Sequence, residues 1–110
     1  MAVYYSTYHF PIHKSGDTFL GLKFTLKNAS GNAISLIGVT IELVTSQPVI
    51  RSLTSLNDAG ITITDAVNGE FEINEQIISW TSGIYDYEII FTFDGGRKRT
   101  YIVGTWQIIN

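Results

Sequence analysis

Apolar and polar side chains alternate through residues 82–106, and this alternation predicts a β-hairpin. The first strand carries Tyr85, Tyr87, Ile89, Phe91 and Phe93 at every second position, with Asp86, Glu88, Ile90, Thr92 and Asp94 between them. A period of two residues is typical of a strand with one buried face. Gly95 and Gly96 can both take the positive φ angles that a two-residue type I′ turn requires. We therefore expect the chain to reverse at these two glycines.

A turn at Gly95 and Gly96 also predicts which residues face one another across the hairpin. The expected pairs are Asp94–Arg97, Thr92–Arg99, Phe91–Thr100, Ile89–Ile102, Tyr87–Gly104 and Tyr85–Trp106. This register brings apolar side chains together and sets charges of opposite sign side by side, which favours antiparallel pairing. It also places Tyr85 and Trp106 in the core.

The same alternation recurs in short segments along the rest of the chain. The expected inward positions are Leu20, Leu22, Phe24 and Leu26, then Val39, Ile41 and Leu43, then Ile61 and Ile63, and finally Phe71 and Ile73. Residues 28–32 and 67–69 have turn compositions. A strand from Tyr4 to His9 is expected to end at Pro11, which cannot donate to a central ladder. Residues 75–80 have no clean period and suggest one helical turn.

These segments add up to seven to nine short strands with turn signals every eight to twelve residues. Such a pattern predicts an all-β domain spanning residues 1–110, either a two-sheet antiparallel sandwich or a partly open small β-barrel. With 110 residues, of which 45% are hydrophobic and 15% charged, the chain can bury a single core.

Charge and cysteine content narrow the classes of function. The net charge of −3 argues against general binding to nucleic acid or to an anionic membrane. Without cysteine there is no disulfide framework and no thiolate zinc site. The N-terminus lacks a basic region followed by an apolar run, so we expect no signal peptide, no membrane insertion and folding in a cytoplasm.

Taken in order, several segments resemble a known family. The matching pieces are residues 16–19 (GDTF), 31–32 (GN), 34–41 (ISLIGVTI), 60–61 (GI), 83–88 (GIYDYE) and 104–106 (GTW). Their order and spacing resemble the immunoglobulin-like sandwich domain of phage tail and baseplate proteins, in particular the N-terminal domain of baseplate upper proteins. The match covers roughly residues 12–109. Ile37 departs from the family, which usually has threonine before the glycine at position 38.

The resemblance implies a structural role. In this family the domain is a building block of the virion that attaches to neighbouring subunits, and it has no catalytic residues. It implies an immunoglobulin-like sandwich, a location in the virion, and other phage structural proteins as partners, with a homo-oligomer as a further possibility. No cofactor is implied.

Candidate chemistry is sparse in this sequence. His9 and His13 lie on an extended segment interrupted by Pro11, and four residues of strand span about 13 Å, too far for one metal ion; surface histidines are the simpler interpretation. No G-x-S-x-G elbow supports a serine hydrolase. Glu70, Glu72 and Glu75 offer carboxylates for glycosidase chemistry, but we expect Glu70 and Glu72 to point out from one strand face into solvent. We therefore predict a protein that is not an enzyme and binds no metal.

Two further segments have simple structural interpretations. Residues 65–70 (DAVNGE) lack the alternating ligands of a calcium loop and predict a β-turn. The basic residues Arg97, Lys98 and Arg99 lack a phosphate-binding loop around them. We expect them to pair across the hairpin with Asp94 and Glu88, or else to contact an acidic partner.

The aromatic residues near the N-terminus suggest an interaction surface. Because Tyr4 and Tyr5 are consecutive, they point to opposite faces of a strand, so at least one of them can lie outside the core. An edge strand can also recruit a neighbour by strand addition. The predicted interaction surface comprises Tyr4, Tyr5, Tyr8, Arg97 and Arg99. The leading hypothesis is a non-enzymatic assembly domain of a phage tail or baseplate, and the alternative is a carbohydrate-binding or adhesion module.

Overall fold

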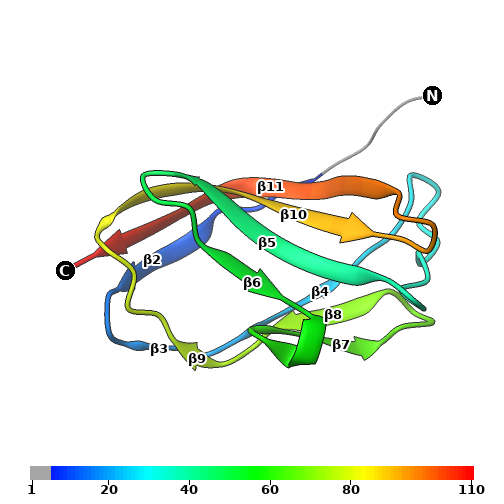
Figure 1. The fold of residues 1–110 in the computed structure, drawn as a ribbon, viewed down its shortest axis with the longest axis horizontal. Helices are drawn as coiled ribbons and strands as arrows, with labels where there is room; N and C mark the ends of the chain where they lie inside the picture. The colour runs from blue at the N-terminus through cyan, green and yellow to red at the C-terminus, as the bar shows by residue number, and fades with distance from the viewer. Residues whose placement is uncertain (1–5) are drawn as a thin grey trace.

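The computed structural model describes residues 6–110, which fold into two packed β-layers (Figure 1). This part of the chain contains eleven strands and one 3₁₀ turn, η1 (Leu56–Asp58). The strands are β1 (Ser6–Thr7), β2 (Phe10–Lys14), β3 (Thr18–Phe19), β4 (Leu22–Thr25), β5 (Thr40–Gln47), β6 (Ser52–Thr54), β7 (Ile61–Asp65), β8 (Glu70–Ile73), β9 (Gln76–Ile77), β10 (Gly83–Thr92) and β11 (Lys98–Ile109). Several are short continuations of one another: β1 leads into β2, β3 into β4, and β8 into β9. Eight strand lines result, within the predicted seven to nine.

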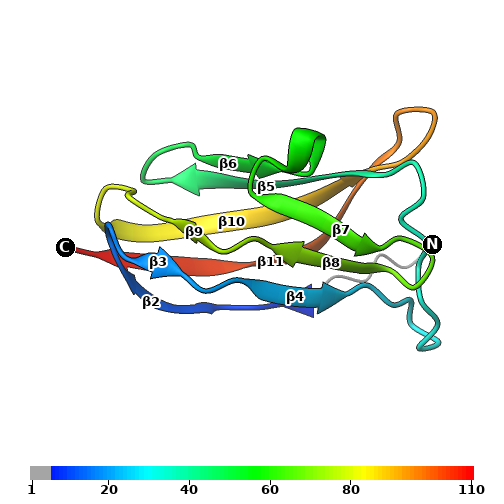
Figure 2. The ribbon, with the colours of Figure 1, turned by 90° about the horizontal axis from the view of Figure 1, so that it is seen from below.

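The strand order is that of an immunoglobulin-like sandwich. One layer, here called the first sheet, has the order β1–β11–β10–β5–β6, with β2 also paired to β11. The second layer has the order β4–β8–β7, and the short pair β3–β9 prolongs it (Figure 2). The all-β sandwich predicted from the alternation is therefore confirmed, and neither layer closes into a barrel.

The N-terminal strands differ in direction from the rest. Both β1 and β2 run parallel to β11, with Ser6 beside Ile102 and Phe10 beside Trp106, whereas the other pairs of strands are antiparallel. Pro11 does not end the strand as predicted, because β2 lies at the outer edge of the sheet, where a residue without an N–H is tolerated.

The hairpin of β10 and β11 confirms the predicted register at its base and corrects it at its tip. Tyr85 faces Trp106, Tyr87 faces Gly104 and Ile89 faces Ile102, as expected. Beyond a β-bulge the pairs shift by one residue, to Ile90–Thr100, Phe91–Arg99 and Thr92–Lys98. The loop has three residues, Asp94, Gly95 and Gly96, because the N–H of Phe93 donates to the carbonyl oxygen of Arg97 at 2.8 Å. The predicted two-residue turn and the Asp94–Arg97 pair are therefore wrong.

Large aromatic side chains from both layers fill the core. Trp106 and Tyr85 are fully buried, as predicted. The ring of Phe10 stacks on Trp106 with centroids 4.1 Å apart, and the ring of Trp80 meets Trp106 edge-on at 5.1 Å. Stacked and edge-on rings add specific geometry to the apolar burial. This cluster lies at the end of the sandwich where β2 passes into β3.

A tyrosine fixes the crossing from the second layer to the first. The Tyr85 hydroxyl, near the start of β10, donates to the carbonyl oxygen of Thr81 at 2.7 Å. This is the geometry of the tyrosine corner found in immunoglobulin-like sandwiches. The buried phenol thus has a partner for its polar end.

Two local predictions are wrong for identifiable reasons. Leu20 was expected to face the core, but it is 79% exposed because Gly21, with a φ of 92°, breaks the strand between β3 and β4. Residues 75–80 contain strand β9 instead of a helical turn, because Gln76 and Ile77 pair with β3.

Candidate docking groove

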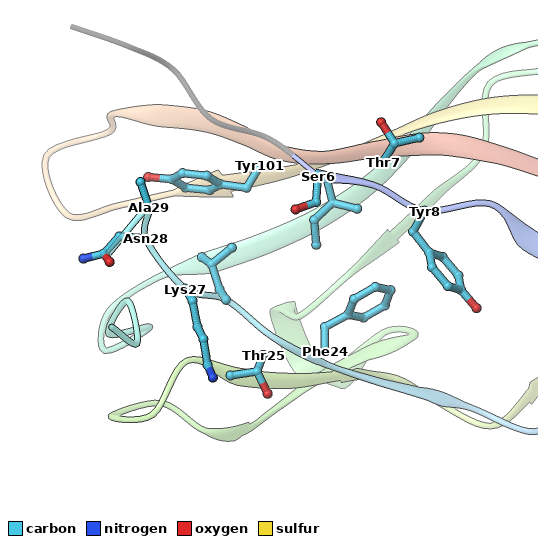
Figure 3. Close-up of a pocket in the computed structure, with 11 residues that line it drawn as sticks. Ser6, Thr7, Tyr8, Phe24, Thr25, Lys27, Asn28, Ala29 and Tyr101 are labelled. Atoms are coloured by element: carbon cyan, nitrogen blue, oxygen red, sulfur yellow. The ribbon is translucent and has the colours of Figure 1, made fainter. Parts of the chain in front are cut away.

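A groove of about 490 Å³ lies between the edges of the two layers, on the side where β1 and β4 face one another (Figure 3). Its lining combines aromatic and aliphatic side chains with hydroxyl, amide and amine groups. The lining residues are Ser6, Thr7, Tyr8, Phe24, Thr25, Leu26, Lys27, Asn28, Ala29, Tyr101 and Ile102. Figure 3 shows Tyr101 beside Ala29 and Asn28 at one end, and Tyr8 and Phe24 at the other. No carboxylate is among these lining residues, so Lys27 is their one charged group.

The groove exists because the sandwich is closed differently on its two sides. On one side the chain passes from β6 through η1 to β7, and a parallel bridge between Thr54 and Gly60 ties the layers together. On the other side β1 ends the first sheet and β4 ends the second. Each of these strands pairs with a neighbour on one side in the described part of the chain, and strands of this kind are natural sites for adding another strand.

Tyr8 forms one end wall of the groove. Its ring contacts the ring of Phe24 edge-on, with centroids 5.7 Å apart, and so bridges β1 and β4. Its N–H donates to the carbonyl oxygen of Val103 at 2.9 Å, which holds the chain against β11. Phe24 in turn stacks on the buried Phe71 at 5.2 Å. The wall is therefore anchored in both layers.

The backbone of Tyr8 is held from the core side by Tyr87 and Gly104. The Tyr87 hydroxyl donates to the carbonyl oxygen of Tyr8 at 2.5 Å. Gly104 lies directly below, and a Cβ atom at this position would overlap the same carbonyl group. Only a residue without a side chain allows the two backbones to approach this closely.

Burial raises the pKa of Tyr87 well above the usual range of a phenol, and the nearby Tyr8 raises it further. The folded protein therefore keeps Tyr87 protonated at pH values where an unfolded chain, with a phenol pKa of about 10, loses the proton. The stability that Tyr87 contributes is complete below this pH and is lost as the pH rises above it.

Replacing Tyr87 by phenylalanine should weaken the alkaline loss of stability. At pH 7 we expect a free energy of unfolding lower by about 1 kcal/mol, because one buried hydrogen bond is lost. Between pH 9 and pH 11 we expect a shallower decline than in the unchanged protein, measured as urea midpoints at each pH. The other tyrosines are present in both proteins. Parallel declines would contradict this role for Tyr87.

Three of the five residues predicted as an interaction surface lie in the described part of the chain, and one of them lines the groove. Tyr8 lies in the groove and is half-buried. Arg97 is exposed beside the hairpin loop, Arg99 is half-buried on β11, and neither arginine lines the groove. Tyr4 and Tyr5 lie outside the described residues. Phe24, Leu26 and Tyr101 also line the groove, although the sequence does not predict it, because an alternating pattern places residues on strands without showing that two strand edges face one another.

The two histidines are held by hydrogen bonds at different depths. His9 is exposed, and its Nδ1 accepts the N–H of Thr105 at 3.1 Å. His13 was expected at the surface, but it is 9% exposed and its Nε2 lies 3.0 Å from the carbonyl oxygen of Asp17. The two buried positions of β2, Phe10 and His13, are three residues apart, because the pairing of β2 with β11 shifts between Trp106 and Ile108. Alternation within a single strand does not reveal such a shift.

The remaining candidates have structural partners. Asn68 donates from Nδ2 to Asp65 Oδ2 at 2.8 Å, and this contact confirms the predicted turn. Within residues 6–110, no three histidine or acidic side chains come together in a way that could hold a metal ion. The same residues include no helix with the length and apolar character needed to cross a membrane.

Comparison with known proteins gives no family assignment. No protein-family model matches the chain, and no curated protein matches it significantly.

Proposed function

We propose that this chain is a non-enzymatic assembly domain of a phage tail or baseplate that works by docking to other structural proteins. The observation that carries the proposal is the groove between β1 and β4, where the open edges of two sheets flank an apolar floor. The resemblance in the order of segments 16–19, 34–41 and 83–88 supports the assignment to a phage particle. Its place of action would then be the virion.

The chemistry of the groove points to an extended segment of a neighbouring phage protein as its occupant. A strand added along β4 can bond to backbone groups at the free edge, while one of its apolar side chains enters between Tyr8, Phe24 and Tyr101. Lys27 favours an acidic residue on that segment, because no carboxylate of the groove lining neutralises it.

A binding experiment with a matched control tests this function. Each tail or baseplate protein encoded next to this chain is purified and titrated against it by interferometry. Thr25→Arg, at an exposed position of β4, should lower the affinity for the partner at least about tenfold by blocking the groove. Thr64→Arg, exposed on the opposite edge strand β7, should leave it unchanged. Equal loss in both variants, or binding by none of the proteins, would contradict the proposal.

The second candidate function is carbohydrate binding, favoured by the tyrosine rings and polar groups that share the groove. Tyr8 and Tyr101 offer rings for stacking on a sugar, and Asn28 and Thr25 offer hydrogen bonds. Saturable binding of an oligosaccharide that is lost in Tyr101→Ala would favour this function over docking to a protein.

A further inference from the structure

The outward face of the first sheet has an acidic hollow of about 500 Å³, separate from the floor of the groove. Its two carboxylates, Asp86 and Glu88, are exposed neighbours on the outer face of β10. The residues that line the hollow include no lysine and no arginine. The hollow therefore attracts cations, and its volume of about 500 Å³ leaves room for whole side chains.

The tip of the β10–β11 hairpin has the opposite charge. Arg97, Lys98 and Arg99 are three of the seven basic residues of a chain whose net charge is −3. Arg97 and Lys98 are exposed. Asp94 does not face Arg97 in the strand pairing, because Phe93 does, and the Asp94 carboxylate lies against Gly38. The basic residues thus follow directly after the three-residue loop, at the distal end of the hairpin.

The tip and the hollow cannot meet within one chain. Glu88 pairs with Val103 on β11, and Arg97 lies six residues before Val103, which corresponds to about 20 Å of strand. This separation of about 20 Å is more than twice the screening length of about 8 Å at physiological ionic strength. The hairpin is held by β5, which pairs with β10 as far as Thr92, and by β1, which pairs with β11 at Ile102 and Val103, so it cannot fold back onto its own outer face.

We propose that the basic hairpin tip of one copy docks in the acidic hollow of a second copy. Charge complementarity between Arg97 and Lys98 on one chain and Asp86 and Glu88 on the next selects a like chain as the partner. The two surfaces are different, so the contact is heterologous and leaves each copy with a free tip or a free hollow. Contacts of this type continue into rings or filaments. The inference does not depend on which partner fills the groove.

This contact is tested by reversing the charges of each surface in a separate variant and then mixing the two variants. We expect the unchanged chain to associate in sedimentation experiments at low salt and to dissociate as salt is raised. Arg97→Glu with Lys98→Glu should weaken self-association at least about tenfold, as should Asp86→Lys with Glu88→Lys. A mixture of the two variants should assemble again, because each acidic tip then meets a basic hollow and each basic tip an acidic one.

A control separates this contact from the effect of net charge. Lys14→Glu with Lys23→Glu lowers the net charge as much as the tip variant does, from −3 to −7, at two exposed positions away from the tip. This control should associate as the unchanged chain does. Monomers of the unchanged chain at low salt would overturn the inference, and so would failure of the mixed variants to assemble. Loss of groove binding in Thr25→Arg with self-association intact would support both proposals separately.

Discussion

Phe10→Ala should lower the free energy of unfolding by about 3–5 kcal/mol, the usual loss for a buried phenylalanine. Phe10 is 5% exposed, stacks on Trp106, and meets the rings of Tyr8 and Tyr87 edge-on. Removing its ring leaves a cavity beneath β2 and frees the N-terminal edge from the core. Urea unfolding followed by tryptophan fluorescence measures the effect.

Ile12→Ala is the matched control for this prediction. Ile12 lies on the same strand, but its side chain is 62% exposed. We expect its replacement to change the free energy of unfolding by at most about 0.5 kcal/mol. Similar losses in the two variants would show that β2 does not contribute to the core through Phe10.

Gly104→Ala should cost about 3 kcal/mol of stability, at the upper end for an overpacked site. The new methyl group would overlap the carbonyl oxygen of Tyr8 and lie 2.7 Å from its carbonyl carbon. The backbone at Tyr8 must then move away from β11, and it loses the hydrogen bond from Tyr87. Because Tyr8 is an end wall of the groove, partner binding should weaken together with stability.

Gly16→Ala is the control for Gly104→Ala. It shows the effect of replacing a glycine by alanine without the overlap with a neighbouring carbonyl group. A Cβ atom at Gly16 meets no atom within 4 Å, but its φ of 93° is unfavourable for alanine. We expect a loss of about 1 kcal/mol from this conformation alone. If Gly104→Ala cost no more than Gly16→Ala, close contact between Gly104 and Tyr8 would be excluded.

The alternation of apolar and polar residues predicts much of this fold, because the inner face of each sheet is apolar and the outer face is more polar. Tyr85, Tyr87 and Ile89 stand inward on β10 as expected, and their partners on β11 follow from counting residues. Sequence alone could not set the loop length, because positive φ angles at Gly95 and Gly96 fit more than one turn. The bulge that compensates for the longer loop has no sequence signal of its own.

The other features that the sequence does not predict depend on contacts between segments that are far apart in the chain. The parallel pairing of β1 with β11 joins Ser6 to Ile102, and local alternation carries no information about such a partner. The candidate site depends on this pairing, since it places Tyr8 across from Phe24. Tyr8 could be singled out as an aromatic residue near the N-terminus, whereas the opening between two sheet edges emerges only in three dimensions.

The bulge near Tyr101 separates the register of the distal part of the hairpin from the register at its base. The loop is one residue longer than expected, yet the pairs from Gly83 to Ile89 keep the spacing that a shorter loop would give, because β11 absorbs the excess. We therefore expect insertions and charge changes within the loop, residues 94–96, to leave Tyr85 and Trp106 in place. The chain can diversify what it presents at that extremity while its scaffold stays unaltered.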